Sequence, residues 1–131
     1  MNSLSKNRLV LVVDDEEDVR ETLSDGLEKN GFKIKTAEGG THAFNIILDD
    51  FVDVVITDLS MANGMGRDLL RRLKDLPYDD RPLVYVISGY DELTSDEIQK
   101  FKVKKFIQKP FSINSLIETV STNLKDTITK K

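Results

Sequence analysis

The 131-residue sequence has no cysteine, a single histidine and no long apolar run. Without cysteine, the chain can form no disulfide bond, thiolate nucleophile or cysteine-ligated zinc site. No apolar segment approaches the roughly eighteen residues that span a membrane. The first eight residues are polar and the apolar run after them is short, which does not fit a signal peptide. These absences predict a cytoplasmic protein that does not contact a membrane.

Size and charge narrow the class of protein further. A chain of 131 residues is typical of one domain and can bury roughly two thirds of its unfolded surface. Its formal net charge of −4 and pI near 5.0 disfavour direct binding to nucleic acid. The sequence has no repeat or low-complexity segment. We expect an N-terminal extension over residues 1–8, one domain over 9–124 and a polar tail over 125–131.

Five apolar runs have the composition of strands in a parallel sheet. The run at 52–58 carries the clearest signal, because apolar and β-branched residues lead into a terminal acid. The second run alternates apolar residues with lysines, so that strand should be less buried. The predicted strands cover residues 9–13, 32–37, 52–58, 83–88 and 103–108.

A helical spacing of apolar residues follows each predicted strand. The first helix begins in an acid-rich segment that suits a positive helix N-terminus and stops at Asn30-Gly31. Further helices are predicted over 41–50, 67–76 and 91–101, the last of which has few apolar residues. Ser112 should cap the fifth helix. This alternation predicts a doubly wound, flavodoxin-like α/β sandwich whose five-stranded parallel sheet has the order 2-1-3-4-5.

Polar side chains stand at the carboxyl ends of four predicted strands. Asp14 and Asp15 follow the first strand, Asp58 ends the third, Ser88 ends the fourth and Lys109 follows the fifth. In the predicted order these strands are neighbours, so the groups should converge at one edge of the sheet. Clustered carboxylates repel unless a cation is present. Oxygen ligands without histidine or cysteine favour Mg²⁺, with Mn²⁺ as the alternative.

This set has the chemistry of a phosphoryl-transfer site. A lysine, a hydroxyl and a divalent cation around one aspartate offer positive charge and donors to phosphoryl oxygens, beside a carboxylate that can attack phosphorus. Each residue also has a structural interpretation. Asp14 or Asp15 would cap the following helix, Ser88 would form a turn and Lys109 would be a solvated charge. Solvated positions are also predicted for His42, Lys100, Lys102, Lys104 and Lys105.

Four segments together resemble the receiver domain of bacterial two-component response regulators. They read LVVDDEEDVR, VVITDLSM, VISGY and FIQKPF, in the family's order and spacing, and the resemblance covers residues 8–124. It implies that Asp58 accepts a phosphoryl group from a histidine kinase or a phosphotransfer protein. It also implies a signalling domain that catalyses only its own phosphorylation and slow hydrolysis, rather than an enzyme.

The resemblance also implies a role for each site residue. Mg²⁺ would be ligated by Asp15, Asp58 and the backbone carbonyl of Ser60, with Asp14 assisting. Ser88 would bind a phosphoryl oxygen and Lys109 would pair with the phosphate.

The resemblance further implies a switch. Ser88 and Phe106 match its two positions, and the face formed by the fourth helix, fifth strand and fifth helix would bind a downstream protein or a second copy of the chain. Ser60 and Tyr90 match positions that tune the lifetime of the phosphate. The Lys109-Pro110 bond matches a peptide that is cis in the family, which proline makes accessible.

Two segments depart from the family pattern. After the acceptor the family reads M-P-x-M-D-G, whereas this chain reads Met61-Ala62-Asn63-Gly64-Met65-Gly66. The loss of proline and gain of glycine predict a more flexible loop. Before the fifth strand, Lys102-Val103 replaces the usual Gly-Ala, so the end of the fourth helix is not defined by the pattern.

Three other classes of protein share parts of this pattern. An unphosphorylated pseudo-receiver scaffold is disfavoured, because Asp14, Asp15, Asp58, Ser88 and Lys109 are all present. A phosphohydrolase with an aspartate nucleophile needs a second acid where Ser60 stands. A flavin-binding module lacks a Ser/Thr-rich loop after the first strand. The chain is either a stand-alone receiver or part of a longer regulator or hybrid kinase.

Overall fold

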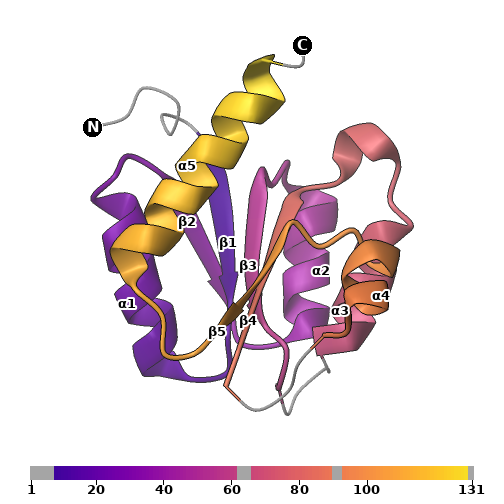
Figure 1. Cartoon of the computed structure of the whole chain (residues 1–131), viewed down its shortest axis with the longest axis horizontal. Coiled ribbons are helices and arrows are strands. Elements are labelled where there is room, and N and C mark those ends of the chain that lie inside the picture. The colour runs from indigo at the N-terminus through magenta and orange to yellow at the C-terminus, as the bar shows by residue number, and fades with distance from the viewer. Residues whose placement is uncertain (1–7, 62–65, 90–92, 130–131) are drawn as a thin grey trace.

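The computed structural model describes residues 8–61, 66–89 and 93–129. Parallel strands form one sheet in the order β2-β1-β3-β4-β5, as predicted (Figure 1). The strands are β1 Leu9–Val13, β2 Lys33–Ala37, β3 Val54–Asp58, β4 Leu83–Ser88 and β5 Lys105–Gln108. The helices are α1 Glu17–Glu28, α2 Gly40–Asp49, α3 Gly66–Lys74, α4 Ser95–Lys100 and α5 Ile113–Thr129, with a short 3₁₀ turn, η2, at Tyr78–Asp80.

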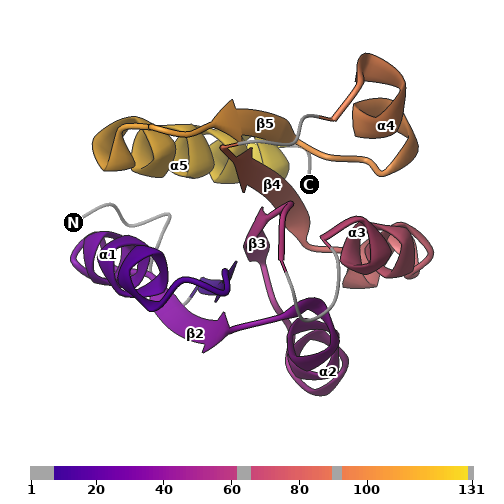
Figure 2. The same cartoon turned by 90° about the horizontal axis from the view of Figure 1, so that it is seen from below.

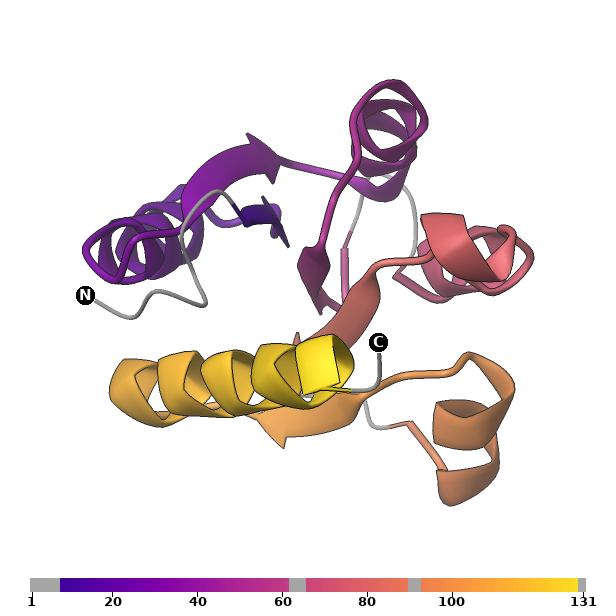
Figure 3. The same ribbon diagram turned by 90° about the horizontal axis from the view of Figure 1, so that it is seen from above.

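Helices cover both faces of the sheet. Helices α1 and α5 lie on one face, and α2, α3 and α4 lie on the other (Figures 2 and 3). Alternate residues of β1 point into two apolar cores. Val10 and Val12 pack with α1 and α5, whereas Leu11 and Val13 pack with α2 and α3. All five residues of β3 are buried, which explains why that strand has no polar face.

Several boundaries differ from the predictions. Strands β2, β3 and β5 each begin later than the apolar pattern suggested. Helix α4 begins at Ser95 rather than at 91, because the Thr94 hydroxyl accepts a hydrogen bond from the Glu97 amide and fixes the first turn. Helix α5 continues to Thr129, into the segment expected to be a tail. Ser112 caps α5 as predicted, its hydroxyl accepting from the Ser115 amide at 3.2 Å.

Two helices end with a residue in the left-handed conformation. Gly31 after α1 has a φ of 94°, and Lys102 after α4 has a φ of 59°. In both places the backbone hydrogen bonds have the Schellman pattern, with Phe32 N donating to Leu27 O and Val103 N donating to Ile98 O. The position at which the family's glycine is missing is therefore the one that adopts the glycine-type conformation. No helix within the described ranges is long and apolar enough to cross a membrane.

Candidate functional site

The carboxyl edge of the sheet, at the bottom in Figure 1, brings the predicted site residues together. The register pairs Val13 of β1 with Thr57 of β3, so the following residues Asp14 and Asp58 leave the sheet side by side. Asp58 in turn lies opposite Ile87 of β4, whose next residue is Ser88. The convergence predicted from strand order is thus a consequence of the parallel register.

Four carboxylates gather at this edge. Asp14, Asp15, Glu16 and Asp58 each contribute one oxygen, and these oxygens all lie within 4.8 Å of one another. Asp14 and Asp58 are only 1% and 4% exposed, whereas Asp15 and Glu16 face solvent. Glu16 was not predicted as a site residue, although it continues the run of acids that flagged its neighbours. The arrangement concentrates negative charge on two buried and two accessible groups.

Lys109 provides the cation nearest to these acids. Its Nζ lies 3.4 Å from Asp58 Oδ2 and 3.5 Å from Asp14 Oδ2, and Glu16 Oε1 is 3.8 Å away. Burial alone would lower the pKa of Lys109, but the three surrounding carboxylates outweigh it, and the pKa lies above its usual value. With its side chain only 22% exposed, Lys109 is not the solvated surface charge of the structural interpretation.

Asp14 combines a structural contact with an unusual electrostatic position. Its Oδ1 accepts a hydrogen bond from the Glu16 amide at 2.9 Å, which forms a turn just before α1 rather than a cap of the helix. Its buried Oδ2 accepts no hydrogen bond from the described residues. Burial raises the pKa of Asp14, and the nearby Asp58 charge adds to the increase. A buried carboxylate oxygen without a hydrogen-bond donor fits a group that faces a cation.

Asp58 and Ser88 end the neighbouring strands β3 and β4. Asp58 Oδ1 accepts from the Ser60 amide at 3.1 Å, and its Oδ2 faces Lys109. The Ser88 side chain is fully buried, and its Oγ has no hydrogen-bond partner among the described residues. Its backbone carbonyl accepts from Lys109 N, which ties β4 to the end of β5. Ser88 therefore holds a buried hydroxyl with unused hydrogen-bonding capacity at the end of the strand next to Asp58.

Of the other predicted residues, the structure describes some and leaves Tyr90 outside the described ranges. Phe106 of β5 pairs with Val86 of β4 and is half-buried against the core on the α2–α4 side of the sheet. Alternation puts Ser88 on that same face, two residues beyond Val86. The Lys109-Pro110 peptide is cis, as predicted. Ser60 is exposed, while Tyr90 and loop residues 62–65 lie outside the described residues.

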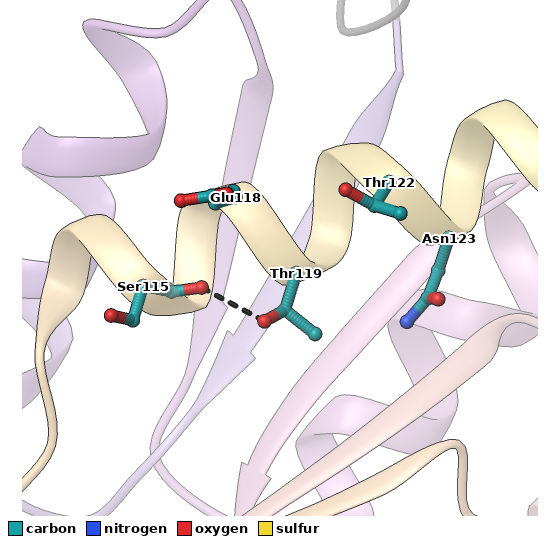
Figure 4. Close-up of a pocket in the computed structure, with 5 residues that line it drawn as sticks. All are labelled: Ser115, Glu118, Thr119, Thr122 and Asn123. Carbon is teal, nitrogen blue, oxygen red and sulfur yellow. Dashed lines mark hydrogen bonds between the residues drawn. The ribbon is translucent and has the colours of Figure 1, made fainter.

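A separate polar pocket lies along α5 and contains none of these residues (Figure 4). Within it, the Thr119 hydroxyl donates to the Ser115 carbonyl at 2.9 Å. Asn123, at the other end of the pocket, donates from its side-chain amide to the buried Tyr85 hydroxyl. Since these hydroxyl and amide groups make hydrogen bonds within the chain, we interpret the pocket as part of the solvent-facing surface of α5 rather than as a second reaction site.

Comparison with known proteins places this geometry in a family. The family model for the response regulator receiver domain matches residues 10–121. The transcriptional regulatory protein FixJ of Rhizobium meliloti is 35% identical over 112 residues, which make up 85% of this chain and 54% of that protein. The response regulator SaeR of Staphylococcus epidermidis is 28% identical over 82% of this chain and 46% of its own length. This chain thus spans about half the length of both regulators.

Solved structures agree with the family model. A receiver domain from the Francisella response regulator 1452 is 30% identical, covers 92% of this chain and 99% of its own, and superposes with a TM-score of 0.80. A CheY-like receiver domain from Methanospirillum hungatei superposes with a TM-score of 0.88 at 20% identity, over 96% of this chain and all of its own, and so shows the fold alone. The chain belongs to the response regulator receiver domain family, whose members are signalling domains of two-component systems.

Proposed function

We propose that this chain is a phosphorylatable receiver in which Asp58 accepts a phosphoryl group in a Mg²⁺-dependent reaction. The observation that carries the proposal is the placement of Lys109 Nζ 3.4 Å from Asp58 Oδ2, with the buried Ser88 hydroxyl, which has no hydrogen-bond partner among the described residues, at the end of the neighbouring strand. A single carboxylate thus has a cation on one side and a hydrogen-bond donor nearby. The Lys109 ammonium and the Ser88 hydroxyl can each bind an oxygen of an incoming phosphoryl group. An Asp58 with only a structural role would not need both.

The transfer uses Asp58 as the nucleophile. One Asp58 carboxylate oxygen attacks phosphorus, a P–O bond forms, and the P–N bond of a phosphohistidine breaks, with the electron pair returning to the imidazole nitrogen. Lys109 balances charge on the phosphoryl oxygens, and Ser88 donates a hydrogen bond to one of them. Buried surroundings strengthen both interactions relative to water. Hydrolysis later returns Asp58 to its carboxylate form.

The acid cluster fits a hard divalent cation. Asp15, Asp58 and the Ser60 carbonyl would hold Mg²⁺, or Mn²⁺, with Asp14 assisting. The buried Asp14 Oδ2 supports this ligand set, because it accepts no hydrogen bond from the described residues and faces only the Lys109 ammonium, 3.5 Å away. When bound, the cation supplies charge neutralisation for the phosphoryl oxygens. Glu16 is close enough to add to the negative field that attracts the ion. The chain itself fixes Asp14 through the Glu16 amide and fixes Asp58 through the Ser60 amide.

Readout is proposed at the face of α4, β5 and α5. Phosphorylation adds about −1.5 to −2 charges and three acceptor oxygens at Asp58. Ser88 turns toward the new oxygens, and Phe106 on the same face of the sheet fills the space beside it. A Phe needs no hydrogen-bond partner when buried. A downstream protein or a second copy of the chain then binds the changed face, and the donor is a histidine kinase or a phosphotransfer protein in the cytoplasm.

The test is labelling with a small phosphodonor. With Mg²⁺ and acetyl phosphate, the intact mass of the chain should rise by one phosphoryl group, and the Asp58→Asn variant should remain unlabelled. Asp53→Asn is a matched control, because Asp53 lies just before the same strand and pairs with Arg8 rather than with the site. Labelling of Asp58→Asn at the normal level would disprove the assignment of the acceptor. An unlabelled wild-type chain would favour the scaffold interpretation.

A further inference from the structure

An ion pair joins the first turns of α3 and α4. Arg67 Nε donates to Glu97 Oε2 at 2.8 Å, and Arg67 Nη2 donates to Glu97 Oε1 at 3.4 Å. Both side chains are little more than a quarter exposed. The fork of the guanidinium meets both carboxylate oxygens, which fixes direction as well as distance. The Arg67 contact, with help from the Thr94 amide, lowers the pKa of Glu97 to about 2, so the pair is charged at neutral pH.

The arginine end of this pair is fixed to the backbone of the acceptor. Gly66, the residue before Arg67, donates its amide to the Leu59 carbonyl at 3.2 Å. A Cβ at Gly66 would lie 2.5 Å from Leu59 O and 2.8 Å from Asp58 O, closer than any side chain tolerates. The start of α3 therefore lies directly against the peptide that carries Asp58. A displacement of this peptide must move Gly66 and, with it, Arg67.

The glutamate end is fixed to the start of α4. Glu97 Oε1 accepts from the Thr94 amide at 3.1 Å, while the Thr94 hydroxyl accepts from the Glu97 amide at 3.1 Å. This reciprocal capping box makes the Glu97 side chain part of the first turn of the helix. If Arg67 moves, the displacement of the Glu97 carboxylate is therefore passed to the N-terminus of α4, because this side chain is not free to rotate.

Helix α4 is the element that such a pull can displace. It has only six residues, none of which is buried. It lies at the edge of the molecule beside α3 (Figures 2 and 3). Elements with few buried apolar contacts are the ones that shift at the lowest free-energy cost. Helix α5, by contrast, contributes Leu116, Ile117, Val120 and Leu124 to the core.

We propose that Arg67 and Glu97 form a clamp that transmits changes at the Asp58 peptide directly to α4. This route rests on the proposed phosphoryl acceptance by Asp58 and is separate from the Ser88–Phe106 route through β4 and β5. It runs from Asp58 through Gly66 to Arg67, and then through Glu97 into the capping box of α4. The clamp uses residues of two different helices, so it works only while the ion pair is intact.

Hydrogen exchange of the full chain tests the clamp, with beryllofluoride and Mg²⁺ as the phosphoryl mimic. Glu97→Gln removes the charge but keeps a residue that completes a capping box. Arg67→Lys keeps the charge but loses the fork. Asp96→Asn removes an acid from the same turn of α4. Arg71→Gln removes a cation from α3 that pairs with Asp68 inside that helix, so these two variants are matched controls.

In wild type, the mimic should change exchange both beside Asp58, at residues 59–60, and in α4, at 95–103. In Glu97→Gln the change at 59–60 should persist while the change in α4 falls at least about twofold, the scale of a partly exposed ion pair. Arg67→Lys should be intermediate, and both controls should match wild type. An undiminished α4 response in Glu97→Gln would overturn the clamp while leaving the acceptor assignment intact. A wild-type chain without any response at 59–60 would overturn both.

Discussion

The carboxyl edge of the sheet and helix α4 are built in opposite ways. At the edge, Asp14 follows the buried strand β1, and Asp58 and Ser88 are the last residues of β3 and β4. All three are at least 96% buried, and the parallel register fixes their strands relative to one another. Helix α4 has no buried residue. Ile98 packs partly against the core and the C-cap Phe101 is buried in it, while a capping box and an ion pair fix the first turn and Lys102 follows the helix in the left-handed conformation. The proposed chemistry thus lies at the end of buried strands, and the proposed readout lies at a short helix with no buried residue.

This difference shows how a small domain can combine a site fixed by buried strands with a surface helix that few buried contacts hold in place. The parallel sheet holds the predicted site groups at fixed separations because β1, β3 and β4 are each hydrogen-bonded to a neighbouring strand on both sides. A short helix without buried residues can shift at a small free-energy cost. The interactions of one new phosphoryl group can offset a cost of that size. The predictions below test whether the two regions behave as differently as their construction implies.

The largest effect is expected from removing a proposed Mg²⁺ ligand at the carboxyl edge of the sheet. Asp15→Asn should weaken Mg²⁺ binding by at least about tenfold, because even outer contacts of metal sites are commonly worth that much. Titration calorimetry or a Mg²⁺-sensitive spectroscopic signal measures the affinity. Asp18→Asn is the control, since Asp18 lies in the first turn of α1 and outside the four-acid cluster. Equal affinity in wild type and Asp15→Asn would remove Asp15 from the ligand set.

An intermediate effect on stability is expected when the buried Tyr85 hydroxyl ionises at high pH. Burial raises the pKa of Tyr85 to about 12, although the Asn123 hydrogen bond opposes the increase. In the unfolded chain a tyrosine ionises near pH 10. The folded state keeps this proton more tightly, so the contribution of Tyr85 to stability is complete below about pH 10 and is lost as pH rises toward 12.

Denaturant unfolding at several pH values, compared with Tyr85→Phe, measures this loss. The wild-type chain should lose more stability than the variant between pH 10 and 12. Ultraviolet titration of the folded chain should show a late-ionising tyrosine that Tyr85→Phe removes. A Tyr85 that ionises near pH 10 in the folded chain would show that the core around α5 is looser than the structure indicates.

The smallest effect is expected at the end of α4. Lys102 has a φ of 59°, where glycine is favoured, so Lys102→Gly should stabilise the chain by about 0.5–1 kcal/mol. Gly31→Ala, at the equivalent end of α1, should destabilise by a similar or larger amount. Chemical denaturation measures both. Lys104→Gly, an exposed position without a positive φ, is the control and should not stabilise. A loss of stability in Lys102→Gly would show that contacts of the Lys102 side chain stabilise the fold by more than the positive φ destabilises it.

Strand order and the main site residues were predictable because they follow from local patterns. Apolar runs ending in acids predict buried parallel strands, and the parallel register then brings Asp14 and Asp58 together. The start of α4 was predicted wrongly because the Thr94 cap competes with the apolar pattern upstream of it. The exposed Glu16 was missed, since an acid in an acidic run has no local signal of its own. The Arg67–Glu97 clamp joins residues 30 apart and depends on helix packing, which no local pattern encodes.

The most direct test of the central claim is an amide NMR spectrum of the chain with Mg²⁺, with and without beryllofluoride. The claim is that a phosphoryl group held at the carboxyl edge of the sheet changes the face of α4, β5 and α5, of which α4 is the helix without a buried residue. Shifts should spread from the surroundings of Asp58 through residues 89–106 to the start of α5. Shifts confined to the loops around Asp14, Asp58 and Lys109 would contradict the claim and leave only the phosphorylation chemistry.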